Sequence, residues 1–208
     1  MSKKTCKLYR NVSDIINPSI SRKNISDYKI LFNDELVPVQ IYYPSIDTIL
    51  DRVTIYVHGR ELCNDFYEEY ALKTNNIVIV IDYSKENYEE ELVRMINYII
   101  EELVKQKIEY KNITLLGDFT GSDLIIGLSD RIDSFNELDK ILISPIDDDL
   151  SKYEFNNVLI LSNNEEQIPN DKMVYNLIKE SLYDFIHDID IITNEKIYKY
   201  ILSFIERR

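Results

Sequence analysis

Hydrophobic positions along the chain form short apolar runs, separated by stretches in which apolar residues recur with a helical period. Runs of this length and β-branched content are typical of strands. They predict seven strands, at Tyr28–Phe32, Leu36–Tyr43, Val53–Val57, Ile77–Ile81, Ile113–Leu116, Lys140–Ser144 and Val158–Ser162. The later runs are continuously apolar, which is the pattern of parallel strands covered on both faces.

The stretches between the strands predict helices. The clearest runs from about Asn87 to Gln106, and others are expected near Thr120–Arg131, Lys172–Leu182 and Glu195–Arg207, the last capped by Asn194. Strands that alternate with helices form right-handed βαβ units, while the short link between the first two strands favours an antiparallel pair. We therefore expect an α/β fold with a mostly parallel central sheet, antiparallel at its start, and helices on both faces. Residues 1–25 are expected to be an irregular leader and residues 26–208 a single domain.

Charge and composition narrow the possible partners. The 208 residues carry a formal net charge of -13, so nucleic acid and anionic membranes are not expected to bind. No apolar run approaches the ~20 residues that span a bilayer, and no apolar segment of a secretory signal follows the N-terminus. The two cysteines, Cys6 and Cys63, indicate no disulfide framework, so a cytoplasmic protein with reduced thiols is expected.

Candidate chemistry lies in the loops that follow the strands, where the sites of such sheets are found. His58-Gly59-Arg60 follows one central strand, and Gly117-Asp118-Phe119-Thr120-Gly121 follows another. A strand that runs through Gly-x-Nu-x-Gly into a helix is a nucleophile elbow, in which the central side chain is held out by a sharp turn. Here the central residue is Phe119, which is no nucleophile.

These two segments resemble the α/β-hydrolases, in particular the hormone-sensitive-lipase-like group that includes acetyl esterases. The segment that begins YVHGREL is similar to the family's His-Gly-Gly-Gly loop, and GDFTGSDLIIGLS to its Gly-Asp-Ser-Ala-Gly-Gly elbow and helix. The resemblance runs from about Val37 to the C-terminus. It implies an α/β-hydrolase fold with minimal or no lid. All four glycines, Gly59, Gly117, Gly121 and Gly127, lie in the matched segments.

The resemblance also assigns roles to residues. Phe119 stands at the nucleophile position, and His187 stands where the catalytic histidine belongs. Glu166 is the best match for the acidic member of the triad, with Glu165 and Asp171 as alternatives.

The same resemblance implies an oxyanion region made by His58, Gly59, Arg60 and Thr120, in which His58 orders the loop and transfers no proton. Arg60 and Glu61 replace the family's second and third glycines, so this loop departs from the pattern.

Other polar residues have plainer interpretations. The hydroxyls of Thr120 and Ser122 are expected to cap the helix after the elbow rather than to replace the missing serine. Asp147–Asp149 is expected to be a solvated loop rather than a metal site. No metal and no cofactor are expected.

Three functions remain open from the sequence. The first is a catalytically impaired hydrolase-fold protein that binds a small-molecule ligand at the remnant pocket, or a protein partner or second copy. The alternative is an esterase of small esters that uses His187 and Glu166 with an unconventional nucleophile or an activated water. The third is a structural or regulatory subunit.

Overall fold

The computed structural model describes residues 8–9, 25–32, 34–44, 51–59, 64–81, 89–129, 135, 137–146, 150, 157–162 and 191–207. The strands in these ranges are β1 (Leu8–Tyr9), β2 (Ile25–Phe32), β3 (Glu35–Tyr42), β4 (Val53–Val57), β5 (Ile77–Ile81), β6 (Ile113–Asp118), β7 (Asp139–Ile143) and β8 (Val158–Leu161). The helices are α2 (Asn64–Thr74), α3 (Glu89–Lys105), the 3₁₀ turn η1 (Tyr110–Asn112), α4 (Thr120–Ser129) and α6 (Ile191–Ile205).

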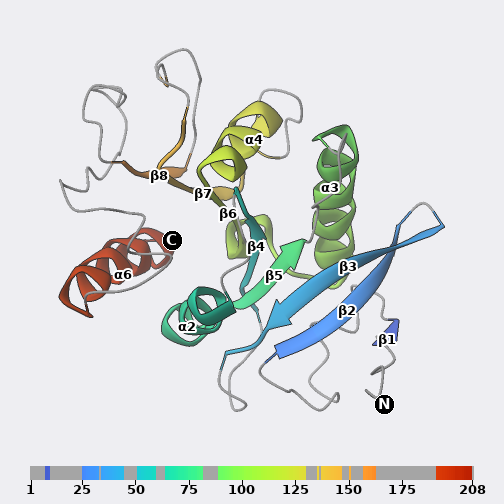
Figure 1. The fold of residues 1–208 in the computed structure, drawn as a ribbon, viewed down its shortest axis with the longest axis horizontal. Helices are drawn as coiled ribbons and strands as arrows, with labels where there is room; N and C mark the ends of the chain where they lie inside the picture. The colour runs from blue at the N-terminus through green and yellow to red at the C-terminus, as the bar shows by residue number, and fades with distance from the viewer. Residues whose placement is uncertain are drawn as a thin grey trace, which may run out of the picture.

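The strands form one sheet in the order β1-β2-β3-β5-β4-β6-β7-β8 (Figure 1). β2 pairs antiparallel with β3, and β3 antiparallel with β5, whereas the pairs from β5 to β8 are parallel. The predicted α/β class, with a mostly parallel sheet that is antiparallel at its start, is therefore confirmed. The sequence did not predict β1, which pairs parallel with β2.

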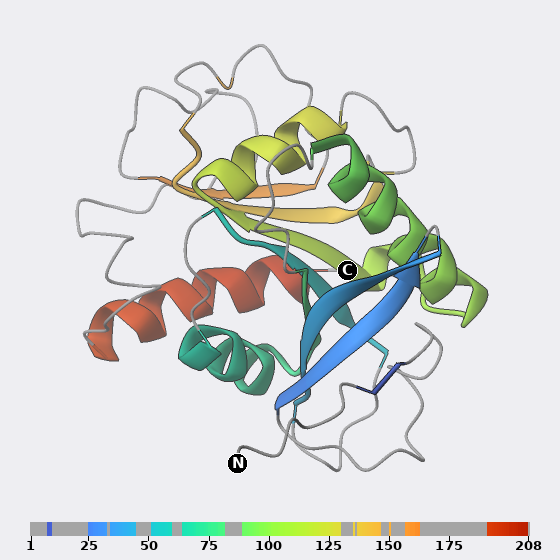
Figure 2. The ribbon, with the colours of Figure 1, turned by 45° about the vertical axis from the view of Figure 1, so that its right-hand side comes forward.

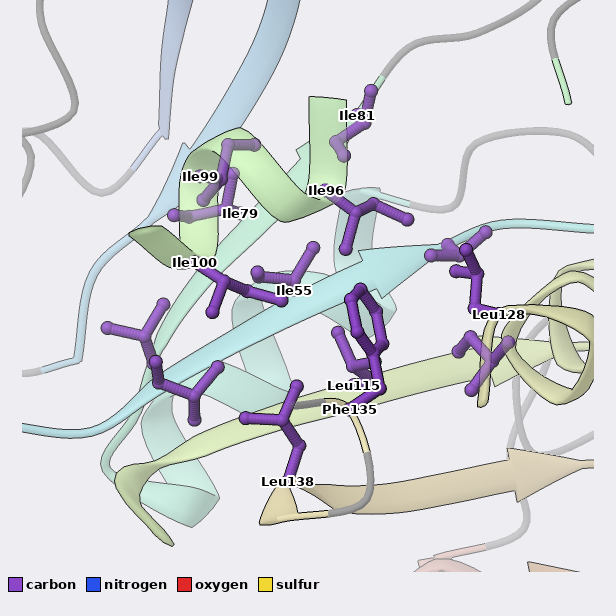
Figure 3. Packing of buried hydrophobic residues seen from close by; sticks show 14 of the residues in the cluster. Ile55, Ile79, Ile81, Ile96, Ile99, Ile100, Leu115, Leu128, Phe135 and Leu138 are labelled. Carbon is purple, nitrogen blue, oxygen red and sulfur yellow. The ribbon is translucent and has the colours of Figure 1, made fainter. Parts of the chain in front are cut away.

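The two faces of the sheet are covered by different helices, as Figure 2 shows: α3 and α4 lie on one side, and α2 and α6 lie next to each other on the other side. The α3/α4 side is packed with aliphatic residues. Figure 3 shows Ile96, Ile99 and Ile100 of α3 meeting Ile55 and Ile79 of the strands. The α2/α6 side is instead rich in aromatic rings.

Several predicted boundaries are confirmed, including the strands Val53–Val57 and Ile77–Ile81, whose residues are all buried. Helix α2 was not predicted, because its buried face is made mainly of Phe66, Tyr67 and Tyr70 rather than aliphatic residues. The prediction that Asn194 caps the last helix is wrong, since α6 begins at Ile191. The predicted helix Lys172–Leu182 lies outside the described residues.

Among the helices that the structure describes, none combines the length and the apolar character needed to cross a membrane.

Candidate functional site

Phe119 forms the turn between a strand and a helix at the carboxyl edge of the sheet. β6 ends at Asp118 and α4 begins at Thr120, so one residue reverses the chain. Its φ angle is 46°, in the left-handed region that costs a bulky residue about 1–3 kcal/mol. The turn thus keeps the conformation of a nucleophile elbow although its tip is phenylalanine.

Backbone hydrogen bonds fix this turn on both sides. The amide of Phe119 donates to Ile143 O of β7 at 2.8 Å. The carbonyl of Phe119 accepts from the amides of Ser122 at 3.0 Å and Asp123 at 3.3 Å, so it closes the first turn of α4. These bonds help to hold Phe119 in its unfavourable conformation.

Three glycines allow the elbow to pack directly against the end of β4. A Cβ on Gly121 would overlap the carbonyl oxygen of Val57, and one on Gly59 would overlap that of Asp118. A Cβ on Gly117 would lie 2.6 Å from the carbonyl carbon of Gly121. At Gly127, by contrast, a Cβ would meet nothing within 4 Å. The first three glycines are therefore required by contacts between backbone segments.

The side chain of Phe119 is partly buried and packs against the aromatic cluster on the α2/α6 side of the sheet. The rings of this cluster belong to Tyr42, Tyr56, Phe66, Tyr67, Tyr70, Tyr198 and Phe204. Successive rings are in contact, with centroids 4.7 Å apart for Tyr56 and Tyr67. Phe119 thus extends an apolar core and offers no reactive group.

The two nearby hydroxyls are both engaged, but not as predicted. Thr120 Oγ1 donates to the carbonyl of Gly59 at 2.9 Å. Ser122 Oγ is fully buried, donates to Gly117 O at 2.7 Å, and accepts from the amide of Ile143 at 3.0 Å. The prediction that they cap α4 is therefore wrong, because these bonds tie the elbow to β7 and to the loop after β4.

Asp118 and His58 are buried beside the elbow. The amide of Gly59 donates to Asp118 Oδ1 at 2.6 Å. Burial raises the pKa of Asp118 above its ordinary value of 3.8, while the Gly59 hydrogen bond and the nearby His58 act in the opposite direction. His58 is 8% exposed and directly precedes Gly59.

The described residues thus bring together seven of the residues that the sequence assigned to the elbow and its loop. Those seven are His58, Gly59, Gly117, Asp118, Phe119, Thr120 and Gly121.

The other members of the expected site are not among the residues that the structure describes. His187, Glu166, Glu165, Asp171, Arg60 and Asp147–Asp149 lie outside the described residues. Within the described ranges, no three histidine, cysteine or carboxylate side chains gather as metal ligands would.

Ser144 is a residue of this edge that the sequence did not single out. It follows β7 just as Phe119 follows β6, since Asp118 and Ile143 are paired in the sheet. Its φ is also 46°, and its amide donates to Leu161 O at 2.7 Å. The sequence signal was a hydroxyl directly after an apolar run and before Pro145.

No protein-family model and no curated protein matches the sequence. Solved structures do resemble it. The structure of the Francisella virulence factor BioJ aligns over 95% of this chain and 89% of its own, with 13% identity and a TM-score of 0.67. An arylesterase aligns over 94% and 88%, with 10% identity and a TM-score of 0.63. A hyperthermophilic esterase from Pyrobaculum calidifontis aligns over 94% and 86%, with 14% identity and a TM-score of 0.63. At such identities the likeness is one of fold.

Proposed function

Starting from the α/β-hydrolase fold that this chain shares with these solved structures, we propose that it is a hydrolase-like protein without serine-esterase chemistry, which acts by binding a ligand or a partner at the elbow edge. The observation that carries the proposal is Phe119 at the tip of an otherwise intact elbow. Acyl transfer by a triad requires a hydroxyl or thiol that a histidine deprotonates. A benzyl side chain supplies none.

The neighbouring hydroxyls support the same conclusion. Ser122 Oγ makes its hydrogen bonds inside the sheet, where no substrate carbonyl reaches it. Thr120 is exposed, but its proton is directed at Gly59 O and it lies one residue beyond the tip. Neither is placed as a strand-end nucleophile.

What the fold retains favours binding. The backbone of the elbow, the first-turn amides of α4 and the loop after β4 together form an edge where related folds bind substrates. His187 and Glu166 are proposed to remain here as a structural pair. The alternative remains an esterase that uses this pair with an activated water or an unconventional nucleophile.

The test is hydrolysis of a short-chain activated ester by the wild type, Phe119→Ser, Phe119→Ala and His187→Ala. We expect an inactive wild type and activity in Phe119→Ser that exceeds the wild type by at least about 100-fold, well below the ~10⁶-fold lost when a triad serine is removed. Phe119→Ala is the matched control, because it removes the ring without adding a hydroxyl.

A fluorophosphonate probe separates the alternatives, since it reacts with activated serines. Mass spectrometry is expected to find no adduct on the wild type and one at position 119 of Phe119→Ser. Wild-type hydrolysis that His187→Ala abolishes would overturn the proposal, and an adduct on Ser144 would then identify the nucleophile.

A further inference from the structure

Asp118 and Thr120, the residues on either side of Phe119, form hydrogen bonds with both backbone polar groups of Gly59. The amide of Gly59 donates to Asp118 Oδ1 at 2.6 Å, and its carbonyl accepts from Thr120 Oγ1 at 2.9 Å. The backbones are also in direct contact, because a Cβ on Gly59 would lie 2.7 Å from the amide nitrogen of Thr120. Residue 119 itself takes no part in either hydrogen bond.

The hydrogen bond that Asp118 accepts from Gly59 is the stronger of the two. Asp118 is only 2% exposed, and a hydrogen bond to an ionised acceptor is shorter and stronger than a neutral one. A carboxylate is buried in this way only where hydrogen bonds compensate for the lost water. The Gly59 amide supplies one such bond, and its N–H is thereby already used as a donor.

Thr120 adds the second bond. In the elbow that this chain resembles, Gly-Asp-Ser-Ala-Gly-Gly, the position after the nucleophile is alanine, which has no hydroxyl. The threonine of this chain therefore ties the loop to the elbow through a contact that alanine cannot make.

We propose that Asp118 and Thr120 are positioning residues, which hold Gly59 and the start of the loop after β4 against the elbow whatever residue stands at position 119. This inference rests on the proposed function, since it takes the elbow and the loop to be the parts of a retained hydrolase-type site.

The glycine content of the chain makes a direct test simple. Only Gly59 follows a histidine, so ¹⁵N-glycine combined with ¹³C-carbonyl histidine identifies its amide signal among four. We expect this signal to lie downfield and to shift in a pH titration with an inflection above 3.8 that belongs to Asp118, because burial raises the pKa of Asp118. A Gly59 amide without such an inflection in folded wild-type protein would overturn the inference.

Variants identify which side chain makes each hydrogen bond to Gly59. In Asp118→Asn the inflection should vanish and the Gly59 signal should move upfield. Asp123→Asn is the matched control, because Asp123 Oδ1 accepts from the amide of Ile146 at 3.0 Å and not from that of Gly59. Thr120→Val should speed exchange of the Gly59 amide with solvent about two- to tenfold, as loss of one neutral hydrogen bond implies, and Thr120→Ser should reverse this. A titration curve of the Gly59 amide that is the same in Asp118→Asn and the wild type, or unchanged exchange in Thr120→Val, contradicts the assignment.

Activity provides the second measurement, in the Phe119→Ser background. There Asp118→Asn and Thr120→Val should lower kcat by about tenfold to 100-fold with little change in KM, because a misplaced loop weakens the transition state more than the bound ester. Thr120→Ser should recover most of the kcat lost in Thr120→Val, and Asp123→Asn should match its parent. An active Phe119→Ser protein that is insensitive to Asp118→Asn and Thr120→Val overturns the inference. An inactive Phe119→Ser protein counts against the proposed function, because it indicates that the hydrolase-type site is not retained. In that case the pH titration of the Gly59 amide alone tests the positioning role of Asp118.

Discussion

Two regions of this protein are built in different ways. The elbow corner, which comprises Val57–Gly59, Gly117–Phe119 and Thr120–Ser122, brings backbone against backbone, with three glycines at the contacts. The two faces of the sheet are instead packed by side chains, aliphatic under α3 and α4 and aromatic under α2 and α6. Side-chain packing adjusts to small changes of volume, whereas contacts between backbones do not. The residues that define the candidate site are therefore less tolerant of substitution than the two packed faces, with the exception of Phe119 at the tip of the turn.

The largest loss of stability is expected from a substitution that disrupts the elbow corner. Gly121→Ala places a methyl group on the carbonyl of Val57, which is main chain and cannot move aside without displacing β4. We expect the loss of stability to exceed about 4 kcal/mol, or the protein to fail to fold. Gly127→Ala, in the same helix but with open space around it, should stabilise by about 0.5–1 kcal/mol. Chemical denaturation measures both, and equal effects of the two changes would show that the corner is no tighter than the helix.

On the aliphatic face the response should be graded. Ile96 is fully buried against the strands, as Figure 3 shows, so Ile96→Ala should cost about 2–5 kcal/mol and Ile96→Val only about 0.5–1.5 kcal/mol. The measurement is the free energy of unfolding in urea. If Ile96→Val costs as much as Ile96→Ala, this face is as intolerant as the corner and the contrast fails.

A smaller effect tests the polar ties of the corner. Ser122→Ala removes the acceptor of the Ile143 amide and leaves that buried N–H without its side-chain partner, at a cost of about 1–3 kcal/mol. Ser203→Ala on the exposed side of α6 should change stability by less than about 0.5 kcal/mol. Thermal unfolding of the two variants measures the difference. A Ser122→Ala protein as stable as Ser203→Ala would mean that the hydroxyl contributes nothing to the corner.

The smallest expected effect concerns pH. Because burial raises the pKa of Asp118 in the folded state, the unfolded chain loses its proton first as pH rises above 3.8. The folded protein therefore loses stability across the window from 3.8 to the raised pKa, and the loss is constant above it. Asp118→Asn should remove this part of the pH dependence, as unfolding in urea at a series of pH values measures. A variant whose stability keeps the wild-type slope in that window would rule out Asp118 as its source.

The sequence predicted the corner better than the faces. Gly117 and Gly121 stand two residues before and two residues after Phe119, where an apolar run meets a helix, and that spacing is enough to predict a sharp turn. Helix α2 was not predicted because Tyr67 and Tyr70 are amphipathic residues. Their burial does not show in the spacing of aliphatic residues along the sequence. Tyrosines of this kind are assigned to a core only once the neighbouring rings are known.

The hydrogen bonds of the elbow corner could not be predicted from the sequence, for a different reason. Gly59 meets Asp118 and Thr120 across more than fifty residues of chain, through the pairing of β4 with β6. A hydroxyl in a first helical turn is usually interpreted as a cap, so the sequence assigned Thr120 and Ser122 to that role. Only the register of the strands shows that their acceptors lie in other segments. The proposed triad members His187 and Glu166 remain predictions.

The left-handed turn at Phe119 has a genetic consequence. A phenylalanine codon becomes a serine codon when its middle base changes, so one point mutation delivers a hydroxyl to a tip that the backbone already presents. Rebuilding the corner from a chain without Gly59, Gly117 and Gly121 would require several simultaneous changes, each harmful alone. The protein therefore combines a backbone turn that is hard to rebuild with a tip residue that one base change can convert to serine.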